Sequence, residues 1–356
     1  MNRYHWNSRY NQATVKTLLL LAGMIFTLLF TSCAQSRGIS HSESTTVSPD
    51  LEIPAPTQTE TKSEISMVEA PSVTPIPTHT SEIPKLSPSP TLTEVPALGP
   101  DEWKNLPIIP EISPNIRAIY QHGLELGNDP HAFSKIGDCG STPAWFLGDF
   151  DRGPRFYDLG PYQRLLPVID EFQGSFSRTS LAAKAGFNAS SVFTTLWSDP
   201  KQCQSGEHPL ACEYRLQRPI IAFITLGSND VHHMDTFETQ MRAIIEFSID
   251  HGVIPILSTK ADNLEGDGSI NATIADLARE YDLPLLNYWQ AVQSLPDRGL
   301  QDDNVHLTWG PNRFGDPQAM KSAWAVRNLS SLQVLNAVWK TVTEQSEFPS
   351  DIQSSK

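Results

Sequence analysis

The stretch "RPIIAFITLGSND" (residues 218–230) decides the fold of this chain. Its centre, residues 220–226, is a nearly continuous apolar run, which is typical of a strand buried on both faces of a parallel sheet. The run ends in the polar sequence Gly-Ser-Asn-Asp (227–230), and chemistry in open parallel sheets gathers at the carboxyl ends of the strands. The stretch therefore predicts a central strand with a polar, potentially functional loop at its end.

Further strands and helices alternate around this strand. The stretch "AFSKIGD" (132–138) predicts a strand that runs into a glycine turn. After the central strand we expect a helix over about 235–251, a strand over 253–259, a helix over 271–281, a strand over 283–289 and a final helix over about 318–343. Strands that alternate with helices of this length indicate βαβ units with right-handed crossovers. The sequence predicts an α/β fold, a three-layer α/β/α domain with a parallel sheet.

The helix after the central strand has recognisable start and stop signals. Asp235 and Glu238 stand at the spacing of a capping box. Gly252 follows the last apolar position of the helix and is a fitting stop. These signals predict a helix that begins near Asp235 and ends before Gly252.

The first 32 residues resemble a secretory signal peptide. Residues 1–16 are basic and contain no acid, and residues 17–30 are almost all apolar. As a helix this run spans about 21 Å, which is shorter than the hydrocarbon core of a bilayer. Cys33 follows small residues in an arrangement that resembles the bacterial lipobox, so we expect a signal peptide over 1–32 and lipidation of Cys33. The alternative is an ordinary signal or an uncleaved anchor with an incidental cysteine.

The rest of the chain divides by composition. Residues 33–103 are rich in Ser, Thr and Pro, which predicts a disordered but semi-stiff stalk. Residues 104–348 are long enough for one α/β core, and residues 349–356 read as a disordered tail. Together with the signal, this organisation predicts an exported bacterial lipoprotein, anchored in a membrane through lipidated Cys33, at the cell surface or facing the periplasm.

The net charge narrows the range of partners. The formal net charge is −14 at pH 7, and both nucleic acid and anionic membrane surfaces require a basic footprint. We therefore expect no nucleic acid partner. We expect a monomer that reaches the membrane through its anchor. No spacing typical of metal ligands occurs, and the acidic stretch "DNLEGDG" (262–268) lacks the periodicity of an EF-hand, so we expect neither a metal nor a cofactor.

The chain has four cysteines: Cys33, Cys139, Cys203 and Cys212. Cys203 and Cys212 are separated by a short, polar, loop-like stretch with Gly206. In an oxidising compartment such a pair predicts a disulfide, which leaves Cys139 outside the bridge. The alternative is a bridge from Cys139 to one of the other two.

Four short polar segments carry candidate chemistry. Cys139 stands on a tight turn after a strand, where a nucleophile is commonly placed. The backbone N–H of Gly186 is open to a ligand, and an amide such as that of Asn229 is a standard donor to a developing oxyanion. Asp303 and His306 are close enough for the carboxylate to orient the imidazole and stabilise its cationic form. Taken singly, each of these residues is also explained by a purely structural role, as a helix cap, a turn residue or a surface residue.

The order of these segments resembles the SGNH (GDSL) hydrolase family over roughly residues 130–310. The resemblance implies a flavodoxin-like α/β/α domain. It also implies that His306 is the general base with Asp303 as its partner. Gly186, Asn229 and the backbone N–H of residue 139 would bind the oxyanion. The family's Gly-Asp-Ser motif stands here as Gly-Asp-Cys (137–139), so the nucleophile is a cysteine or is absent.

Three functions follow from this resemblance. The first is an exported, lipid-anchored esterase or acyl transferase that acts on ester-linked acyl groups, glycan- or lipid-linked, through a Cys139-His306-Asp303 triad. The second is a catalytically inactive lipoprotein of the same fold that binds glycan or lipid at the cell surface. The third is a structural surface lipoprotein. Ser141, two residues beyond the family's serine position, is a weaker alternative nucleophile.

Overall fold

The computed structural model describes residues 98–99 and 101–343, all within one of the two units into which the chain divides, Leu86–Lys356. The predicted signal peptide (1–32), Cys33, most of the predicted stalk and the predicted tail (349–356) lie outside the described residues. No helix among the described residues is both long enough and apolar enough to cross a membrane.

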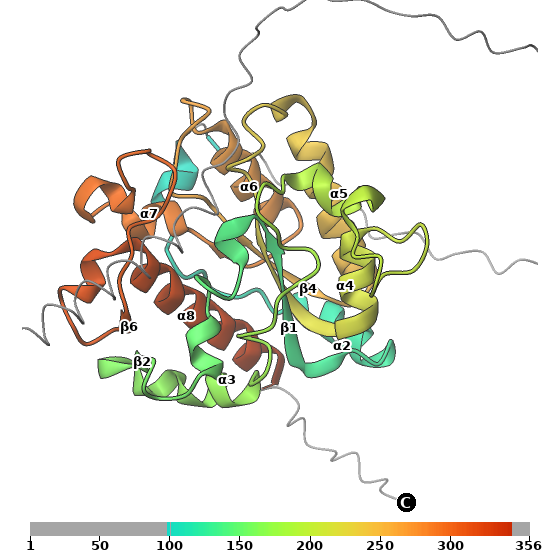
Figure 1. The fold of residues 1–356 in the computed structure, drawn as a ribbon, viewed down its shortest axis with the longest axis horizontal. Helices are drawn as coiled ribbons and strands as arrows, with labels where there is room; N and C mark the ends of the chain where they lie inside the picture. Colours follow the sequence, from blue (N-terminus) through green and yellow to red (C-terminus); the bar gives the residue numbers. More distant parts are fainter. Residues whose placement is uncertain (1–97, 100, 344–356) are drawn as a thin grey trace, which may run out of the picture. The chain divides into compact units, whose positions relative to one another are not determined.

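A parallel sheet forms the centre of the domain, and the apolar run 220–226 lies inside it, as predicted. The strands are, in spatial order, β1 (Asp129–Gly137), β3 (Pro219–Thr225), β4 (Ile254–Ser258) and β5 (Leu285–Leu286), and every adjacent pair is parallel. A separate parallel pair joins β2 (Tyr157–Asp158) to β6 (Asn312–Arg313). Figure 1 shows the main sheet enclosed by helices.

A single parallel bridge extends this sheet beyond β1. Gly137 pairs with Ala183. The N–H of Gly137 donates to the carbonyl of Ala182, and the N–H of Lys184 donates to the carbonyl of Gly137, both at 3.1 Å. The flavodoxin-like order has a full strand on this side of its first strand, and here that strand is reduced to one bridge. The carboxyl end of β1 therefore lies between two neighbours, at the topological switch point where α/β sheets bind ligands.

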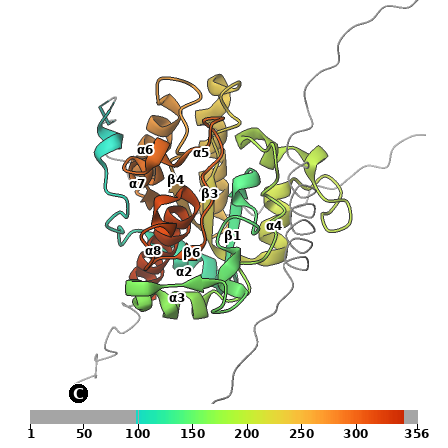
Figure 2. The same ribbon diagram turned by 60° about the vertical axis from the view of Figure 1, so that its left-hand side comes forward.

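Helices cover both faces of the sheet (Figures 1 and 2), so the predicted three-layer α/β/α fold is confirmed. One face is covered by α2 (Ile116–Glu125), α3 (Leu166–Glu171), α7 (Tyr288–Val292) and α8 (Ala323–Thr343). The other is covered by α4 (Pro209–Gln217), α5 (Met234–Asp250) and α6 (Ser269–Glu280). Two hydrophobic cores result, one on each side of the sheet.

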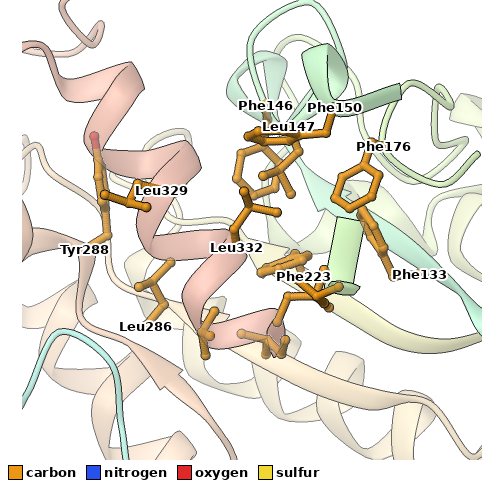
Figure 3. Close-up of a cluster of buried hydrophobic side chains, with 14 of the residues drawn as sticks. Phe133, Phe146, Leu147, Phe150, Phe176, Phe223, Leu286, Tyr288, Leu329 and Leu332 are labelled. Atoms are coloured by element: carbon orange, nitrogen blue, oxygen red, sulfur yellow. The ribbon is translucent and has the colours of Figure 1, made fainter. Parts of the chain in front are cut away.

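The core under α8 is dominated by aromatic rings (Figure 3). Phe133 of β1 contacts Phe223 of β3 edge-on at 5.6 Å between ring centroids, and both rings are fully buried. Leu332 of α8 is buried in the same cluster. Because strand side chains alternate, Ala222 and Ile224 point into the opposite core. Each buried large side chain stabilises the fold by roughly 1.5–3 kcal/mol, so α8 is held firmly against β1 and β3.

Two predicted elements differ from the structure. The strand expected over 283–289 is only two residues long, because the buried Asn287 ends it and caps α7 through a hydrogen bond from the Gln290 N–H. The capping box expected at Asp235 is wrong, since α5 begins at Met234 with His233 as its cap and no side-chain cap bond. Glu238 instead forms an ion pair with Arg242 at 3.0 Å.

A buried lysine lies in the middle of β1. Lys135 is 1% exposed, and its Nζ donates to the carbonyl of Phe176 at 2.7 Å. Burial lowers the pKa of Lys135 to about 7, and the nearby charge of Arg178 acts in the same direction. The folded state therefore binds the proton of the Lys135 side chain more weakly than the unfolded chain does.

We predict that this lysine makes the protein more stable as the pH rises from 7 to 9.5. In that range the unfolded chain keeps the Lys135 proton, because its pKa there is about 10.4, whereas the folded state releases it. Lys135→Met should remove most of this pH dependence and raise stability at pH 7, as measured by urea unfolding at several pH values. Lys201→Met, at an exposed position, is the control. Equal pH slopes in wild type and Lys135→Met would contradict the assignment.

Candidate functional site

The turn after β1 presents Cys139 at the carboxyl end of the sheet. Cys139 begins a single 3₁₀ turn, η2 (Cys139–Ser141), and the Asp138 side chain caps it by accepting the N–H of Gly140 at 2.8 Å. A Cβ at position 137 would lie 2.7 Å from the Thr225 carbonyl, so glycine is required there. Cys139 is partly exposed. The turn is thus tight, capped and placed at the switch point of the sheet.

Ser141 is not an alternative nucleophile. Its side chain is fully buried, and its hydroxyl is hydrogen-bonded to the hydroxyl of Thr225. A buried hydroxyl engaged between β1 and β3 cannot reach a substrate, so among the side chains of this turn the thiol of Cys139 is the nucleophile that solvent reaches.

Asp303 and His306 form the pair that the sequence predicts. Asp303 Oδ2 lies 2.5 Å from His306 Nδ1, and Oδ1 accepts the N–H groups of Val305 and His306 at 3.0 and 2.9 Å. Asn304 adopts a left-handed conformation, with φ +58°, that folds the carboxylate back onto the imidazole. Partial burial raises the pKa of Asp303, but the hydrogen bonds from His306 and Val305 outweigh it and bring the pKa to about 2. Asp303 is therefore an anion throughout the physiological range and orients His306.

Asn229 and Gly186 belong to segments that are joined directly. The Asn229 side-chain amide donates to the carbonyl of Phe187 at 2.9 Å. Asp230 accepts the N–H of Ala189 at 2.8 Å. Gly186 has φ +82° and open space around its Cβ position, so its backbone conformation and not crowding favours glycine there. The loop after β3 is thus hydrogen-bonded to the residues that follow Gly186, through Asn229 and Asp230.

Electrostatic interactions connect the first, third and last segments. Burial raises the pKa of Asp138, and the positive charges of Arg327 and His306 lower it in part. Burial also raises the pKa of Asp230, with the charge of Asp138 acting in the same direction. These interactions couple Asp138 to Asp230 and to His306. The backbone bonds of Gly137 to residues 182 and 184 bring the Gly186 segment to the same end of the sheet.

A buried ion cluster, which we call the Lys260 cluster (Lys260, Asp262 and Glu265), supports the Asn229 loop. Lys260 Nζ lies 2.7 Å from Asp262 Oδ1 and 2.5 Å from Glu265 Oε2. Asp262 Oδ2 accepts the hydroxyl of Ser228 at 2.6 Å, one residue before Asn229. The sequence predicts only an acidic loop over 262–268. The sequence signal that could have revealed the cluster is Lys260 itself, a lysine between the buried strand predicted over 253–259 and the acidic loop.

The predicted disulfide joins Cys203 and Cys212 and leaves Cys139 outside it. The stretch is less loop-like than predicted, because Cys212 lies in α4, which begins at Pro209. Glu207 lies within 4.8 Å of both sulfurs, the only such group of potential metal ligands among the described residues. Both sulfurs are used by the disulfide, and Glu207 binds Arg215 at 2.7 Å, so this group does not fit a metal ion.

Known proteins offer a weak structural likeness to this chain. The chain matches no protein-family model and no curated protein. Among solved structures it is similar to a GDSL-like lipase from Bacteroides thetaiotaomicron, with 13% sequence identity and a TM-score of 0.38, over 63% of this chain and 99% of the lipase chain. At this TM-score we draw nothing from the likeness about reaction or substrate.

We predict that Lys260→Met destabilises the protein by about 3–5 kcal/mol, because it leaves two carboxylates of the Lys260 cluster buried without a cation. Chemical denaturation at pH 7 measures the change. Lys321→Met, at an exposed position, should change stability by less than about 0.5 kcal/mol. A loss as small in Lys260→Met as in this control would show that the cluster does not hold the loop.

Proposed function

We propose that the protein is a hydrolase of SGNH type that cleaves or transfers ester-linked acyl groups, with Cys139 as nucleophile. The observation that carries this proposal is the 2.5 Å contact between Asp303 and His306. The charge of His306 also lowers the pKa of Asp138, the residue before Cys139, so the pair acts on the nucleophile turn. The resemblance of the four ordered segments to the SGNH family supports the same reaction class.

The geometry supports a two-step acyl transfer. The Nδ1–H of His306 donates a hydrogen bond to the carboxylate of Asp303, which stays ionised, and this tautomer leaves Nε2 to accept the proton of the Cys139 thiol. The sulfur attacks the ester carbonyl carbon, and the carbonyl oxygen becomes an oxyanion near the amide of Asn229 and the N–H groups of Gly186 and residue 139. Collapse of this intermediate breaks the carbon–oxygen bond. The departing alkoxide takes the proton from His306 and leaves a thioester on Cys139.

The second step resolves the thioester. His306 takes a proton from water, or from an acceptor hydroxyl, as that oxygen attacks the thioester carbonyl. The carbon–sulfur bond breaks, and His306 returns the proton to the sulfur. Water yields a free acid, and a hydroxyl acceptor yields a new ester.

We further propose that the enzyme is exported and membrane-anchored through lipidated Cys33, with the stalk holding the catalytic domain away from the bilayer. These segments lie outside the described residues, and the proposal rests on their composition. The substrate would then be a glycan- or lipid-linked acyl ester at the cell surface.

Two observations favour a second function, a binding protein without catalysis. Sulfur replaces the family's oxygen at the nucleophile position. The side chains of His306 and Asp303 are also 53% and 48% exposed, although desolvation strengthens catalytic electrostatics. In this alternative the same end of the sheet would bind glycan or lipid.

We predict that wild type hydrolyses a short-chain chromogenic ester and that His306→Ala and Cys139→Ala each lower kcat/KM at least about 100-fold, because each removes a group required for proton transfer or attack. Steady-state kinetics on the purified protein measures this. His131→Ala, at the opposite end of β1, is the matched control. Turnover that survives both active-site changes would rule out the triad. Saturable glycan binding by an inactive wild type would favour the binding protein.

We also predict that Asn229→Ala lowers kcat about 10²- to 10³-fold with little change in KM, because an oxyanion donor acts mainly in the transition state. The melting temperature of the variant must be compared with wild type, since the same amide also binds the Phe187 carbonyl. A raised KM with unchanged kcat would instead place Asn229 in ground-state binding.

A further inference from the structure

An arginine that the sequence does not single out lies beneath the nucleophile turn. Arg327 is in the second turn of α8 and is only 9% exposed. Its guanidinium lies over the rings of Phe146, Trp324 and Tyr288, at 4.7, 5.2 and 5.7 Å from the ring centroids. Aromatic faces attract a cation and fix its plane. The guanidinium is therefore held in one orientation inside the domain.

The guanidinium lies beside Gly140, the residue after Cys139. A Cβ at position 140 would lie 3.1 Å from Arg327 Nη1, so the missing side chain of Gly140 makes room for it. Burial lowers the pKa of Arg327, and the charges of Tyr288, Asp138 and Cys139 act in the opposite direction. The two acidic groups of the turn, the carboxyl of Asp138 and the thiol of Cys139, thus share one buried cation.

We infer that Arg327 stabilises the thiolate of Cys139 and is a positioning residue for the nucleophile. The inference rests on the proposed function, in which Cys139 attacks. A nearby cation favours the ionised thiol, which is the reactive form of cysteine. A serine nucleophile loses its proton only as it attacks, so it has no resting anion that a fixed cation would stabilise. Arg327 therefore fits the Gly-Asp-Cys form of the motif in particular.

A purely structural role is the competing explanation, because the charge of Arg327 also lowers the pKa of the buried carboxyl of Asp138. The other titratable groups around the turn are His306, Asp262 and Asp230, which interact with Asp138, and the neutral phenol of Tyr288, which donates to the Ala323 carbonyl. A structural role predicts lost stability and an unchanged thiol. Electrostatic support of the thiolate predicts a changed ionisation of Cys139.

The test is the pH dependence of Cys139 alkylation by iodoacetamide in the full-length protein. Mass spectrometry of the Cys139 peptide separates it from other cysteines. In wild type the rate should reach half its maximum well below pH 8.5, the value of an ordinary cysteine. Arg327→Met should shift the midpoint up by about one pH unit and lower the rate at pH 6.5 by up to about tenfold. Arg327→Lys should restore most of the rate, because it keeps the charge.

Matched controls separate this result from other causes. Arg313→Met, at an exposed position, should leave the profile unchanged. His306→Ala measures the part of the shift that the imidazole supplies. A folded Arg327→Met with the wild-type profile would overturn the inference, and so would an Arg327→Lys no better than Arg327→Met.

A second variant keeps the test valid if Arg327→Met does not fold. Arg327→Gln keeps a polar, planar head group and removes the charge, so the alkylation midpoint should again move up. A midpoint that stays or falls in a folded Arg327→Gln overturns the inference. Alkylation needs no turnover. If wild type is inactive but shows the predicted midpoints, only the proposed hydrolase is contradicted. If wild type is active but its alkylation midpoint does not change when Arg327 is substituted, only this inference is contradicted.

Discussion

The contact between Gly137 and Thr225 is the constraint on which the site depends. A Cβ on Gly137 would collide with the Thr225 carbonyl, so only glycine lets the ends of β1 and β3 lie side by side here. The same residue exchanges backbone hydrogen bonds with residues 182 and 184 on its other side. One glycine thus brings the Cys139 turn, the Asn229 loop and the Gly186 segment to the switch point of the sheet.

Electrostatics shape this end of the sheet as much as packing does. Three buried or partly buried carboxylates, Asp138, Asp230 and Asp262, gather around it, and Lys260 and Arg327 are the buried cations beside them. Such charges are costly to bury unless they are paired. Their arrangement gives the loop carrying Asn229 a rigid support and gives the turn carrying Cys139 a positive neighbour. A cysteine at position 139 is chemically consistent with that environment.

Much of this organisation could be predicted from local pattern. The apolar run of β3, the helix predicted to end before Gly252 and the short Cys203–Cys212 separation are signals carried by neighbouring residues, and the structure bears them out. The same local reasoning was wrong where a tertiary contact competes. Asn287 looked like part of a strand, but its buried amide also binds the carbonyls of Trp103 and Leu106, some 180 residues away, and it caps α7.

By itself the sequence determined the α/β/α class, the order of the four polar segments and the pairing of Asp303 with His306, because periodicity and short spacings express those properties directly. Only the tertiary structure decided which buried charges support the Asn229 loop and the turn of the candidate nucleophile. Lys260 follows β4 and Arg327 belongs to α8, both far along the chain from Cys139. Their approach depends on how α8 and the loops pack against the sheet, and no pattern of neighbouring residues encodes a distance between segments nearly 190 residues apart.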